Sequence, residues 1–344
     1  MGGRLPANTL GNGQSIQMPV NENSIVTVAI PVLNGGALLA EVLEAVRAQQ
    51  LDRELELLVC DSGSSDGSVE LARSLGARVI EIAPSSFSHG GTRNLLMSEA
   101  GGDYVAFLTQ DATPAAPDWL AQLLAGFELA DDVALVHGPY LPRVGAPPEV
   151  ARELEQHFAQ LAPDGRPVID RAGTDESWES VSSRATFFTD ANGAVARSAW
   201  EQVPFPDVPY AEDRMLARRM LKHGFAKVYQ PGAGVLHSHH YSSRDLFGRY
   251  FDEFRGLRET FGHVESASPL RAASRIRSST SADYRWALAD GAERSAALLA
   301  AARAARHHAI RASAAALGSR ADHLNPAVRR AISLEGRGSF LPTS

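Results

Sequence analysis

The sequence contains a single cysteine, Cys60, so no disulfide can form within the chain. Cys60 lies inside an apolar run and is expected to be a small buried hydrophobic residue. No apolar run reaches the roughly 18 residues of a spanning helix, and residues 1–23 lack a basic segment followed by an apolar one. We therefore expect a protein that neither spans a membrane nor is secreted, and that resides in a reducing cytoplasm.

The chain also lacks an excess of positive charge. Its 33 Lys and Arg against 40 Asp and Glu give a net charge of −7, which does not favour binding to nucleic acid. Residues 271–344 differ, because they contain twelve Arg and no Lys against five acids. This basic tail predicts contact with an anionic membrane surface, at the inner face of the membrane, or with an anionic acceptor. A solvated helix or a homodimer interface explains the same composition.

Along the first third of the chain, short apolar runs typical of strands alternate with segments whose apolar residues recur at helical spacing. A β-branched run at 25–32 ends at Asn34-Gly35-Gly36 and is followed by apolar residues at helical spacing. The pattern repeats with a strand at 55–60, a polar turn and a helix closed by Gly76. Further strands are expected at 78–82 and 104–108, with a helix at 91–100 between them. Successive units of this kind predict a doubly wound α/β fold with a parallel sheet and right-handed crossovers.

The remaining chain is expected to extend this fold and then to become helical. We expect a helix from Asp118, strands at 133–137, 186–196 and 225–229, and a helix at 212–223, with an irregular acidic stretch before 178. Residues 246–261 and 279–317 are predicted to be helices. The expected domains are a flexible leader (1–23), a catalytic domain (24–243, with halves 24–112 and 113–243) and a helical C-terminal region (244–344).

In open α/β sheets, ligands bind beyond the carboxyl ends of the strands, and polar clusters follow several of these ends. Taken alone, Asn34, which follows the first strand, indicates only a turn. Asp61 begins the polar turn after the second strand, and its carboxylate is placed to accept a hydrogen bond from a pyrimidine N3–H. Asp66 in the same turn is expected to cap the next helix.

Asp111 emerges after the fourth strand and is the natural anchor for a divalent cation beside a diphosphate, although it also reads as a turn residue before Pro114. Glu212 and Asp213 start a helix, where acids commonly complement the helix dipole. His237-Ser238-His239-His240 reads as a polar loop. Together, these last two groups provide a carboxylate to deprotonate a hydroxyl and an imidazole to complete a metal shell.

These clusters, in this order, resemble glycosyltransferase family 2 over roughly residues 24–243. The matching segments are Val28-Ala29-Ile30-Pro31-Val32-Leu33-Asn34, the Asp61 to Ser68 turn, Thr109-Gln110-Asp111, and Glu212-Asp213 before His237. Phe87-Ser88-His89-Gly90-Gly91-Thr92-Arg93-Asn94 and Val235-Leu236-His237-Ser238-His239 are most similar to the bacterial rhamnosyltransferase subgroup. The resemblance implies the GT-A fold, which has a mostly parallel Rossmann-like sheet, here followed by a helical appendage.

The resemblance also implies an inverting transferase that uses a nucleotide-diphosphate sugar, with dTDP-L-rhamnose as the expected donor and Mg²⁺ or Mn²⁺ as the cofactor. Asp213 would be the catalytic base with Glu212 supporting it, and Asp111, His237 and, less directly, His239 would hold the metal. Asn192 and Gly193 resemble the acceptor-side strand, although a simple β-turn explains them equally. The residues expected at the donor are Pro31, Asn34, Asp61, Ser62, His89, Gly90, Arg93, Gln110 and Asp111.

One position departs from the family pattern. Thr109 stands where the metal motif usually has its first acid, which leaves Asp111 as the only acid of the motif and gives His237 more weight. Two alternatives follow: a UDP- or GDP-sugar as donor, or a nucleotide-sugar binding protein without catalysis. A sugar-nucleotide pyrophosphorylase is disfavoured because Asn34-Gly35-Gly36 lacks a lysine. The expected acceptor is a hydroxyl, in this family often that of a lipid-linked surface polysaccharide.

Overall fold

The computed structural model describes residues 25–336 except 209 and 240, so the leader predicted at 1–23 lies outside the described residues. Contacts between residues divide the chain into two compact units. The first contains residues 25–141 and His157–His237, and the second contains Pro142–Gln156 and the chain from Ser238 onward. Residues Pro142–Gln156 therefore interrupt the first unit in sequence but belong to the second unit.

An eight-stranded sheet forms the centre of the first unit, in the order β3-β2-β1-β4-β9-β6-β10-β8. Strands β1, β2, β3 and β4 are parallel, and β1 pairs with β2 from Val26↔Leu55 to Val32↔Asp61. The strand bounds are β1 Val26–Val32, β2 Leu55–Asp61, β3 Arg78–Glu81, β4 Tyr104–Leu108, β6 Val133–His137, β8 Val168–Asp170, β9 Asn192–Ala196 and β10 Ala226–Tyr229.

Strand β9 lies antiparallel to both neighbours, β4 and β6, so the sheet is mixed. The strand expected at 186–196 is shorter than predicted, because only Asn192–Ala196 is extended and paired. Upstream, Thr186 Oγ1 donates to the carbonyl of Ser180, and Ala191 N–H donates to Thr189 Oγ1. Hydroxyl groups that bond locally to the backbone in this way compete with a strand ladder.

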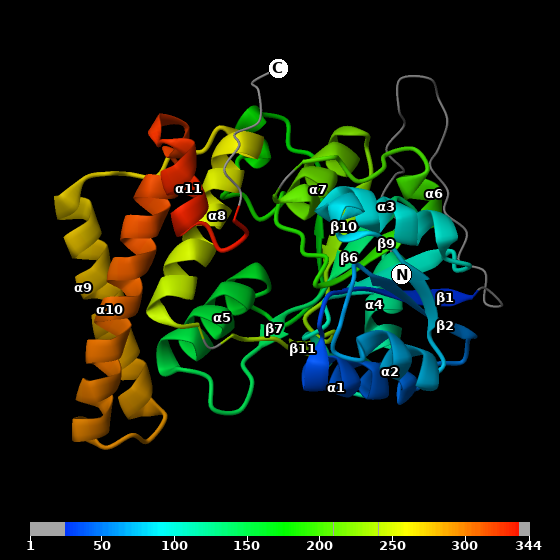
Figure 1. The fold of residues 1–344 in the computed structure, drawn as a ribbon, viewed down its shortest axis with the longest axis horizontal. Coiled ribbons are helices and arrows are strands. Elements are labelled where there is room, and N and C mark those ends of the chain that lie inside the picture. The colour runs from blue at the N-terminus through cyan, green and yellow to red at the C-terminus, as the bar shows by residue number, and fades with distance from the viewer. Residues whose placement is uncertain (1–24, 209, 240, 337–344) are drawn as a thin grey trace, which may run out of the picture. The chain divides into compact units, whose positions relative to one another are not determined.

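Helices cover both faces of the sheet (Figure 1). Helices α1 (Gly36–Arg47), α2 (Ser68–Ser74) and α4 (Trp119–Phe127) lie on one face, and α3 (His89–Glu99), α6 (Arg197–Trp200) and α7 (Glu212–Lys222) lie on the other. Short 3₁₀ turns occur at η1 (Pro84–Ser86) and η2 (Glu176–Glu179). The predicted doubly wound α/β architecture is confirmed, because a mostly parallel sheet is buried between two helical layers.

A small second sheet in the first unit has the order β5-β11-β7. Strand β5 (Thr113–Pro114) pairs with β11 (Val235–Leu236), and β11 pairs with β7 (Tyr140–Leu141). These pairings bring the chain just after Asp111 next to the chain just before His237.

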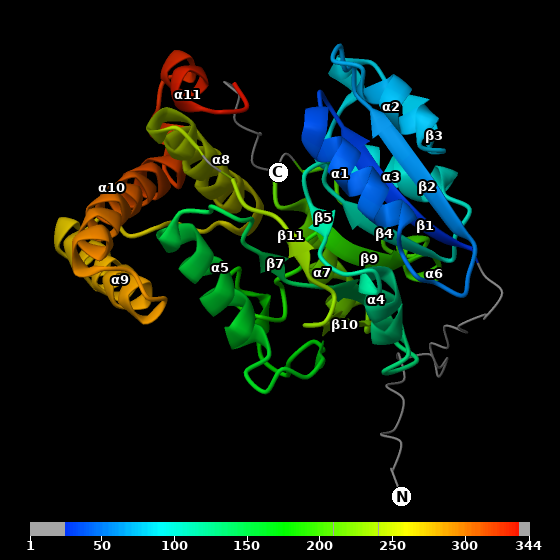
Figure 2. The ribbon, with the colours of Figure 1, turned by 90° about the horizontal axis from the view of Figure 1, so that it is seen from below.

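The second unit is helical and includes the start of α5 (Pro148–Leu161), a helix within the stretch that the sequence left irregular. Its other helices are α8 (Ser243–Phe261), α9 (Pro269–Ala289), α10 (Arg294–Gly318), η3 (Ala321–His323) and α11 (Pro326–Ile332). Helices α9 and α10 lie side by side in both ribbon views (Figures 1 and 2). The break between them falls at Gly291, whose φ is 89°.

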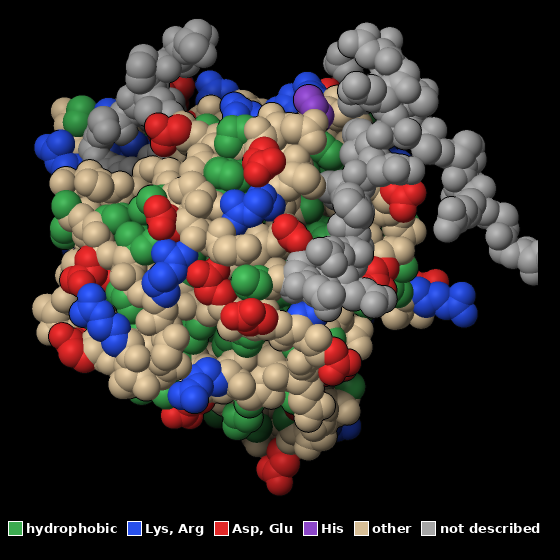
Figure 3. All heavy atoms as spheres, turned by 90° about the vertical axis from the view of Figure 1, so that its right-hand side faces the viewer, with side chains coloured by type: hydrophobic (Ala, Val, Ile, Leu, Met, Phe, Trp, Pro, Cys, Tyr) green, Lys and Arg blue, Asp and Glu red, His purple; other side chains and the backbone are tan. Residues whose placement is uncertain are grey.

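No helix among the described residues is long and apolar enough to cross a bilayer. On the face drawn in Figure 3, acidic and basic side chains alternate, and hydrophobic side chains form only small separate patches. The described side chains visible on that face therefore form no continuous basic stripe of the kind that tracks a nucleic-acid backbone.

Candidate active site

The loops after β1 and β2 are joined by hydrogen bonds at the carboxyl edge of the sheet. Asn34 N–H donates to Ser64 Oγ, and Ser65 N–H donates to Asn34 Oδ1. Asp66 accepts from Gly36 N–H and Ser68 N–H, so it joins the two loops, while Gly67 takes the N-cap position of α2. The expected cap at Asp66 is therefore displaced by one residue.

The loop after β4 joins the same edge. Gln110 accepts from Leu33 N–H through Oε1 and donates to the Leu33 carbonyl through Nε2, at 2.8 and 3.1 Å. Pro31 is half-buried within β1. Three predicted donor-side segments thus come together, and their backbone positions are fixed by side-chain hydrogen bonds rather than by secondary structure.

Asp61 ends β2 and is 2% exposed. Its Oδ1 accepts from the N–H groups of Gly63 and Ser64, both at 2.9 Å, which orders the following turn. Its Oδ2 has no hydrogen-bond partner within the described part of the chain. A buried carboxylate oxygen without a partner is costly unless a ligand supplies a donor. Ser62, by contrast, is bonded to the Val32 carbonyl through both its N–H and its hydroxyl.

Asp111 and His237 lie together, with Asp111 Oδ1 3.5 Å from His237 Nδ1. Both side chains are mostly buried, and the His237 N–H donates to the Leu141 carbonyl, which fixes the backbone. Thr109 Oγ1 has no hydrogen-bond partner among the described residues. His239 lies two residues past His237, where the second unit begins, and its ring is stacked on Tyr241.

A second charged group surrounds Arg93 of α3, which is 4% exposed. Its guanidinium forms a two-point ion pair with Asp190, including a 2.7 Å bond from Nη2 to Oδ1, and lies 3.1 Å from Glu212 Oε1 through Nη1. Arg93 was expected among the residues at the donor. In the structure its side chain pairs with Asp190, which lies in the loop before β9, and with Glu212 of α7.

Glu212 and Asp213 occupy the first turn of α7, as predicted. Burial, together with the neighbouring charge of Asp190, raises the pKa of Asp213 to about 7 against the opposing charge of Arg214. Burial likewise raises the pKa values of Asp190 and Glu212, while Arg93 lowers both. A carboxyl group that exchanges its proton near neutral pH is suited to general base catalysis.

Tyr140 connects the two groups. Its ring packs edge-on against His237 with centroids 4.7 Å apart, and its hydroxyl is hydrogen-bonded to Thr189 Oγ1, one residue before Asp190. The Asp111–His237 pair and the Asp190–Arg93–Glu212 group are therefore neighbours in the first unit. This arrangement brings a carboxylate–imidazole pair close to a group of buried carboxylates.

His89 and Gly90 begin α3. His89 Nδ1 lies 3.8 Å from Glu212 Oε1, so it belongs to the same charged group. A Cβ at Gly90 would lie 2.1 Å from the Pro206 carbonyl oxygen, so only glycine permits this approach of two backbones.

Neighbouring residues take up the hydrogen-bonding groups of the Asn192 side chain and the space beside Gly193. The Asn192 amide accepts from Trp119 Nε1 and donates to the carbonyls of Pro139 and Ala233, and its side chain is buried. A Cβ at Gly193 would lie 2.4 Å from the Thr189 carbonyl oxygen. Both residues hold β9 in place.

Sequence reasoning missed Asp190 and Tyr140. Asp190 follows two Phe and a Thr in a run that reads as a buried strand, and a lone acid in such a run was the available signal. A cavity of about 400 Å³, lined in part by Phe187, Ser183 and Arg214, adjoins this segment. Arg214 follows Asp213 directly, which makes the cavity a candidate for the acceptor side.

Comparison with known proteins identifies the family of the chain. The model of the family described as Glycosyl transferase family 2 matches residues 27–189. The O-antigen chain rhamnosyltransferase RfbN of Salmonella typhimurium is 34% identical over 232 residues, which cover 66% of this chain and 70% of that protein. The O-antigen chain rhamnosyltransferase WbaN of Salmonella anatum is 31% identical over 229 residues, with 66% and 70% covered.

Among solved structures, the mannosyltransferase PcManGT from Pyrobaculum calidifontis, in complex with GDP-Man and Mn²⁺, superimposes with a TM-score of 0.56. The match is 20% identical and covers 88% of each chain, and it supports the fold. Together with the mixed α/β sheet and the acids at its carboxyl edge, these relationships establish that the chain belongs to glycosyltransferase family 2 and is a glycosyltransferase with a GT-A fold.

Proposed function

We propose that the protein transfers L-rhamnose from dTDP-L-rhamnose to a hydroxyl of a surface polysaccharide intermediate, with inversion at the anomeric carbon. The observation that carries the transfer step is Asp213, whose carboxyl group has a pKa of about 7 beside Arg93, Asp190 and Glu212. The donor is suggested by the names of the relatives RfbN and WbaN, and a polysaccharide acceptor by the same names.

Asp61 supports a pyrimidine nucleotide. Its unpartnered, buried Oδ2 lies at the carboxyl end of β2, the edge where doubly wound folds bind nucleotides. Thymine and uracil each present one N3–H, which a single carboxylate oxygen can accept. We assign Asp61 to the base, and the joined loops at Asn34 and Gln110 to the shape of the donor site.

The Asp111–His237 pair fits a divalent cation. A carboxylate oxygen and an imidazole nitrogen 3.5 Å apart are suitable ligands for one ion, and the unpartnered Thr109 hydroxyl lies two residues away. We propose Asp111 and His237 as ligands of Mg²⁺ or Mn²⁺, with His239 as a further ligand. When bound, the cation would offset the negative charge that develops on the leaving diphosphate.

The residues of this chain would then supply the proton transfer and the orientation. Asp213 takes the proton of the acceptor hydroxyl as that oxygen attacks the anomeric carbon on the face opposite the nucleotide. Arg93 fixes Asp190 and Glu212, and these two acids set the charge around Asp213. We propose that Arg93 and His89 position the acids of this site, and that Asn192, Gly193 and Gly90 position its backbone.

The first experiment replaces Asp213 by Asn. Because D213N removes the base but keeps the shape, transfer is expected to fall by about 10²–10⁴-fold while donor affinity stays unchanged. Transfer is measured by product formation and affinity by calorimetry. The matched control, D131N in the exposed turn before β6, should keep both. Normal transfer by D213N would exclude Asp213 as the base.

The second experiment compares dTDP-L-rhamnose with UDP- and GDP-sugars, with and without Mn²⁺. We expect the tightest binding for dTDP-L-rhamnose and a requirement for the cation in transfer. Tightest binding of a UDP- or GDP-sugar would replace the donor but keep the transferase. Donor binding without transfer to any acceptor would favour a nucleotide-sugar binding protein, which has no use for an acid such as Asp213.

The helices α9 and α10 support peripheral contact with an anionic membrane surface. Arginines on both helices are exposed, and so are Leu270, Leu298 and Leu299, at 84%, 60% and 68%. Exposed arginines with neighbouring exposed leucines are typical of a surface that rests on anionic lipid headgroups. We propose this contact as the way in which the enzyme reaches a lipid-linked acceptor.

A further inference from the structure

Two histidines and a glutamate converge within the second unit, apart from the residues assigned to transfer. Glu153 of α5 lies with its Oε1 3.6 Å from His308 Nδ1 and its Oε2 4.0 Å from His307 Nε2, both on α10. One ligand atom of each residue lies within 4.8 Å of the other two. Both histidines are buried, and the Glu153 side chain is 26% exposed.

A buried acid orients one of these histidines. Asp283 of α9 is 1% exposed, and its Oδ2 lies 2.7 Å from His308 Nε2. When Nε2 carries the proton that Asp283 accepts, the lone pair of the neutral ring is on Nδ1, which faces Glu153. Metal-binding histidines are commonly held in this way by a carboxylate on the second ring nitrogen.

The environment of His307 also suits a neutral ligand. Burial lowers the pKa of His307, with the nearby charge of Glu153 acting in the opposite direction. Its Nε2, the atom that lies nearest Glu153, is 3.4 Å from the Tyr250 hydroxyl, and a zinc ion would replace that long contact. A neutral imidazole with a directed nitrogen is the form that coordinates metals.

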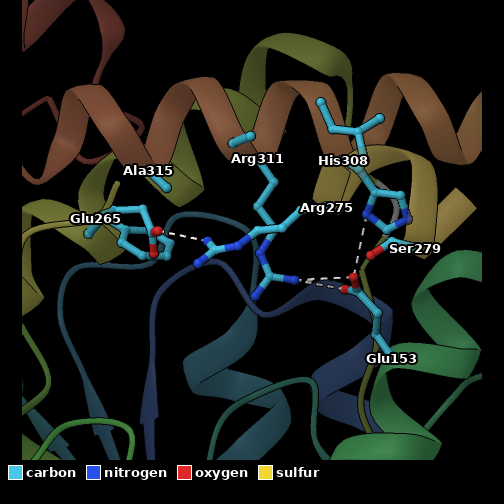
Figure 4. Close-up of a pocket in the computed structure, with 10 residues that line it drawn as sticks. Glu153, Glu265, Arg275, Ser279, His308, Arg311 and Ala315 are labelled. Carbon is cyan, nitrogen blue, oxygen red and sulfur yellow. Dashed lines mark hydrogen bonds and ion pairs between the residues drawn. The ribbon is translucent and has the colours of Figure 1, made fainter. Parts of the chain in front are cut away.

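Arg311, one turn after His307, also contacts Glu153. Its Nη1 lies 3.1 and 3.2 Å from the two carboxylate oxygens, and its guanidinium lies over the Tyr250 ring. Figure 4 shows His308 and Arg311 reaching from α10 toward Glu153. Arg311 neutralises Glu153 in the metal-free protein and therefore competes with a cation for it.

The group opens onto a cavity of about 230 Å³, lined by Glu153, His308 and Arg311 together with Arg275 and Ser279 (Figure 4). The cavity provides an entry path and room for a water molecule beside Glu153 and His308. An ion with three protein ligands and one water has the coordination number that zinc prefers.

We propose that Glu153, His307 and His308 bind a zinc ion, with Asp283 positioning His308. Zinc–ligand distances of about 2.0–2.1 Å place tetrahedral ligands roughly 3.3 Å apart, so the three ligand atoms, which lie within 4.8 Å of one another, move closer together when zinc binds. Two imidazoles and a carboxylate favour zinc over Mg²⁺ or Ca²⁺. The ion links α5 to α10, which are far apart in sequence.

The test uses the full-length D111N/H237A variant, so that zinc cannot bind at the candidate active-site pair. After equilibration with ZnCl₂ and gel filtration, one zinc per chain is expected, and Co²⁺ is expected to give the visible absorption of a tetrahedral site. H308A and E153Q should lose the bound zinc, whereas H323A, at an exposed histidine of the same unit, should keep it. Circular dichroism verifies that each variant is folded.

Two further variants separate zinc binding from a purely structural ion-pair network. D283N should weaken zinc binding by about 10–100-fold. R311Q should tighten zinc binding, because the guanidinium that competes with zinc for Glu153 is removed. If the residues formed only a structural ion-pair network, R311Q would lower the stability of the protein without any gain in zinc affinity. Absence of zinc in the D111N/H237A protein, or unchanged zinc affinity in E153Q and H308A, would overturn the proposal. Neither outcome depends on the sugar donor or on Asp213.

Discussion

At the scale of single residues, the backbone is unusual next to the proposed site. Asn34 and Ala211 are the non-glycine residues with positive φ in the described part of the chain, at 51° and 58°. Asn34 belongs to the joined loops at the donor edge, and Ala211 directly precedes Glu212 and Asp213. For alanine this conformation costs about 1 kcal/mol or more, and such positions concentrate at functional sites. The bend at Ala211 turns the first acids of α7 toward Arg93.

Thr109 leads to a prediction about the cation. T109D supplies the acid that the family motif usually has, so we expect it to lower the Mn²⁺ concentration needed for half-maximal transfer. T109S, which keeps the hydroxyl, is the control and should behave as the parent protein. Activity titrated with MnCl₂ after chelation measures the difference. An unchanged or higher Mn²⁺ requirement in T109D would mean that position 109 is not directed at the ion.

The raised pKa of Asp213 leads to a prediction about pH. Below pH 7 the folded protein keeps Asp213 largely protonated and without base function, so kcat/KM should rise as pH increases through about 7 and then level off. D190N removes a charge that raises this pKa, so the rising limb should move to lower pH. The pH of this rise is an apparent pKa of the interacting carboxyl groups as a set, because their protonation is coupled. A limb that stays in place in D190N would argue against this coupling.

At the scale of elements, the early strands could be predicted from the sequence because each is a short apolar run that ends in a polar turn. Strand β9 was predicted too long, and its antiparallel direction could not be predicted, because that direction depends on pairing with β4 and β6, which are distant in sequence. Helix α5 was missed because the charged residues Glu149 and Arg152 occupy buried positions, which interrupts the apolar stripe by which a helix is recognised in a sequence.

The site followed the same division. Asp61, Asp111, Glu212, Asp213 and His237 could be proposed from the sequence because each lies near the end of a strand or the start of a helix. Asp190 lies in neither place, and its importance comes from Arg93, 97 residues earlier. The buried roles of Asn192 and Gly193 also depend on partners that local sequence patterns do not identify.

Helix α3 provides a prediction at this scale. Because a Cβ at Gly90 would meet the backbone carbonyl of Pro206, G90A should displace α3 and destabilise the fold by about 1–3 kcal/mol. G101A is the matched control, since its Cβ would have its nearest neighbour at an ordinary 3.5 Å. Urea unfolding followed by fluorescence measures both. Equal stability of the two variants would show that α3 can move away from the Pro206 carbonyl without a loss of stability.

At the scale of the whole molecule, the chain combines an acidic α/β unit with a helical unit rich in arginine. The catalytic domain was predicted to end at 243, whereas the contacts between residues place the boundary at His237 and add Pro142–Gln156 to the helical unit. The excess positive charge of residues 271–344 thus belongs to a unit of its own, built largely from α9 and α10.

That distribution predicts binding to anionic vesicles. The protein should sediment with vesicles that contain anionic lipid, more weakly as salt increases, and little with neutral vesicles. R294Q/R303Q should reduce binding, since each arginine near the surface contributes about 1 kcal/mol, whereas R73Q on α2 should not. Equal binding to neutral vesicles, or none to either kind, would contradict membrane contact. A dimer in solution would then identify these helices as an interface.

Cys60 lies on β2, is 1% exposed and directly precedes Asp61. Burial and, to a smaller extent, the adjacent charge of Asp61 raise the pKa of its thiol to about 11, so the folded protein offers almost no thiolate to an alkylating reagent. A thiol reagent can therefore react only when the sheet opens. As the only cysteine of the chain, Cys60 makes the labelling rate a direct record of that opening, and nucleotide sugar bound at Asp61 should slow it.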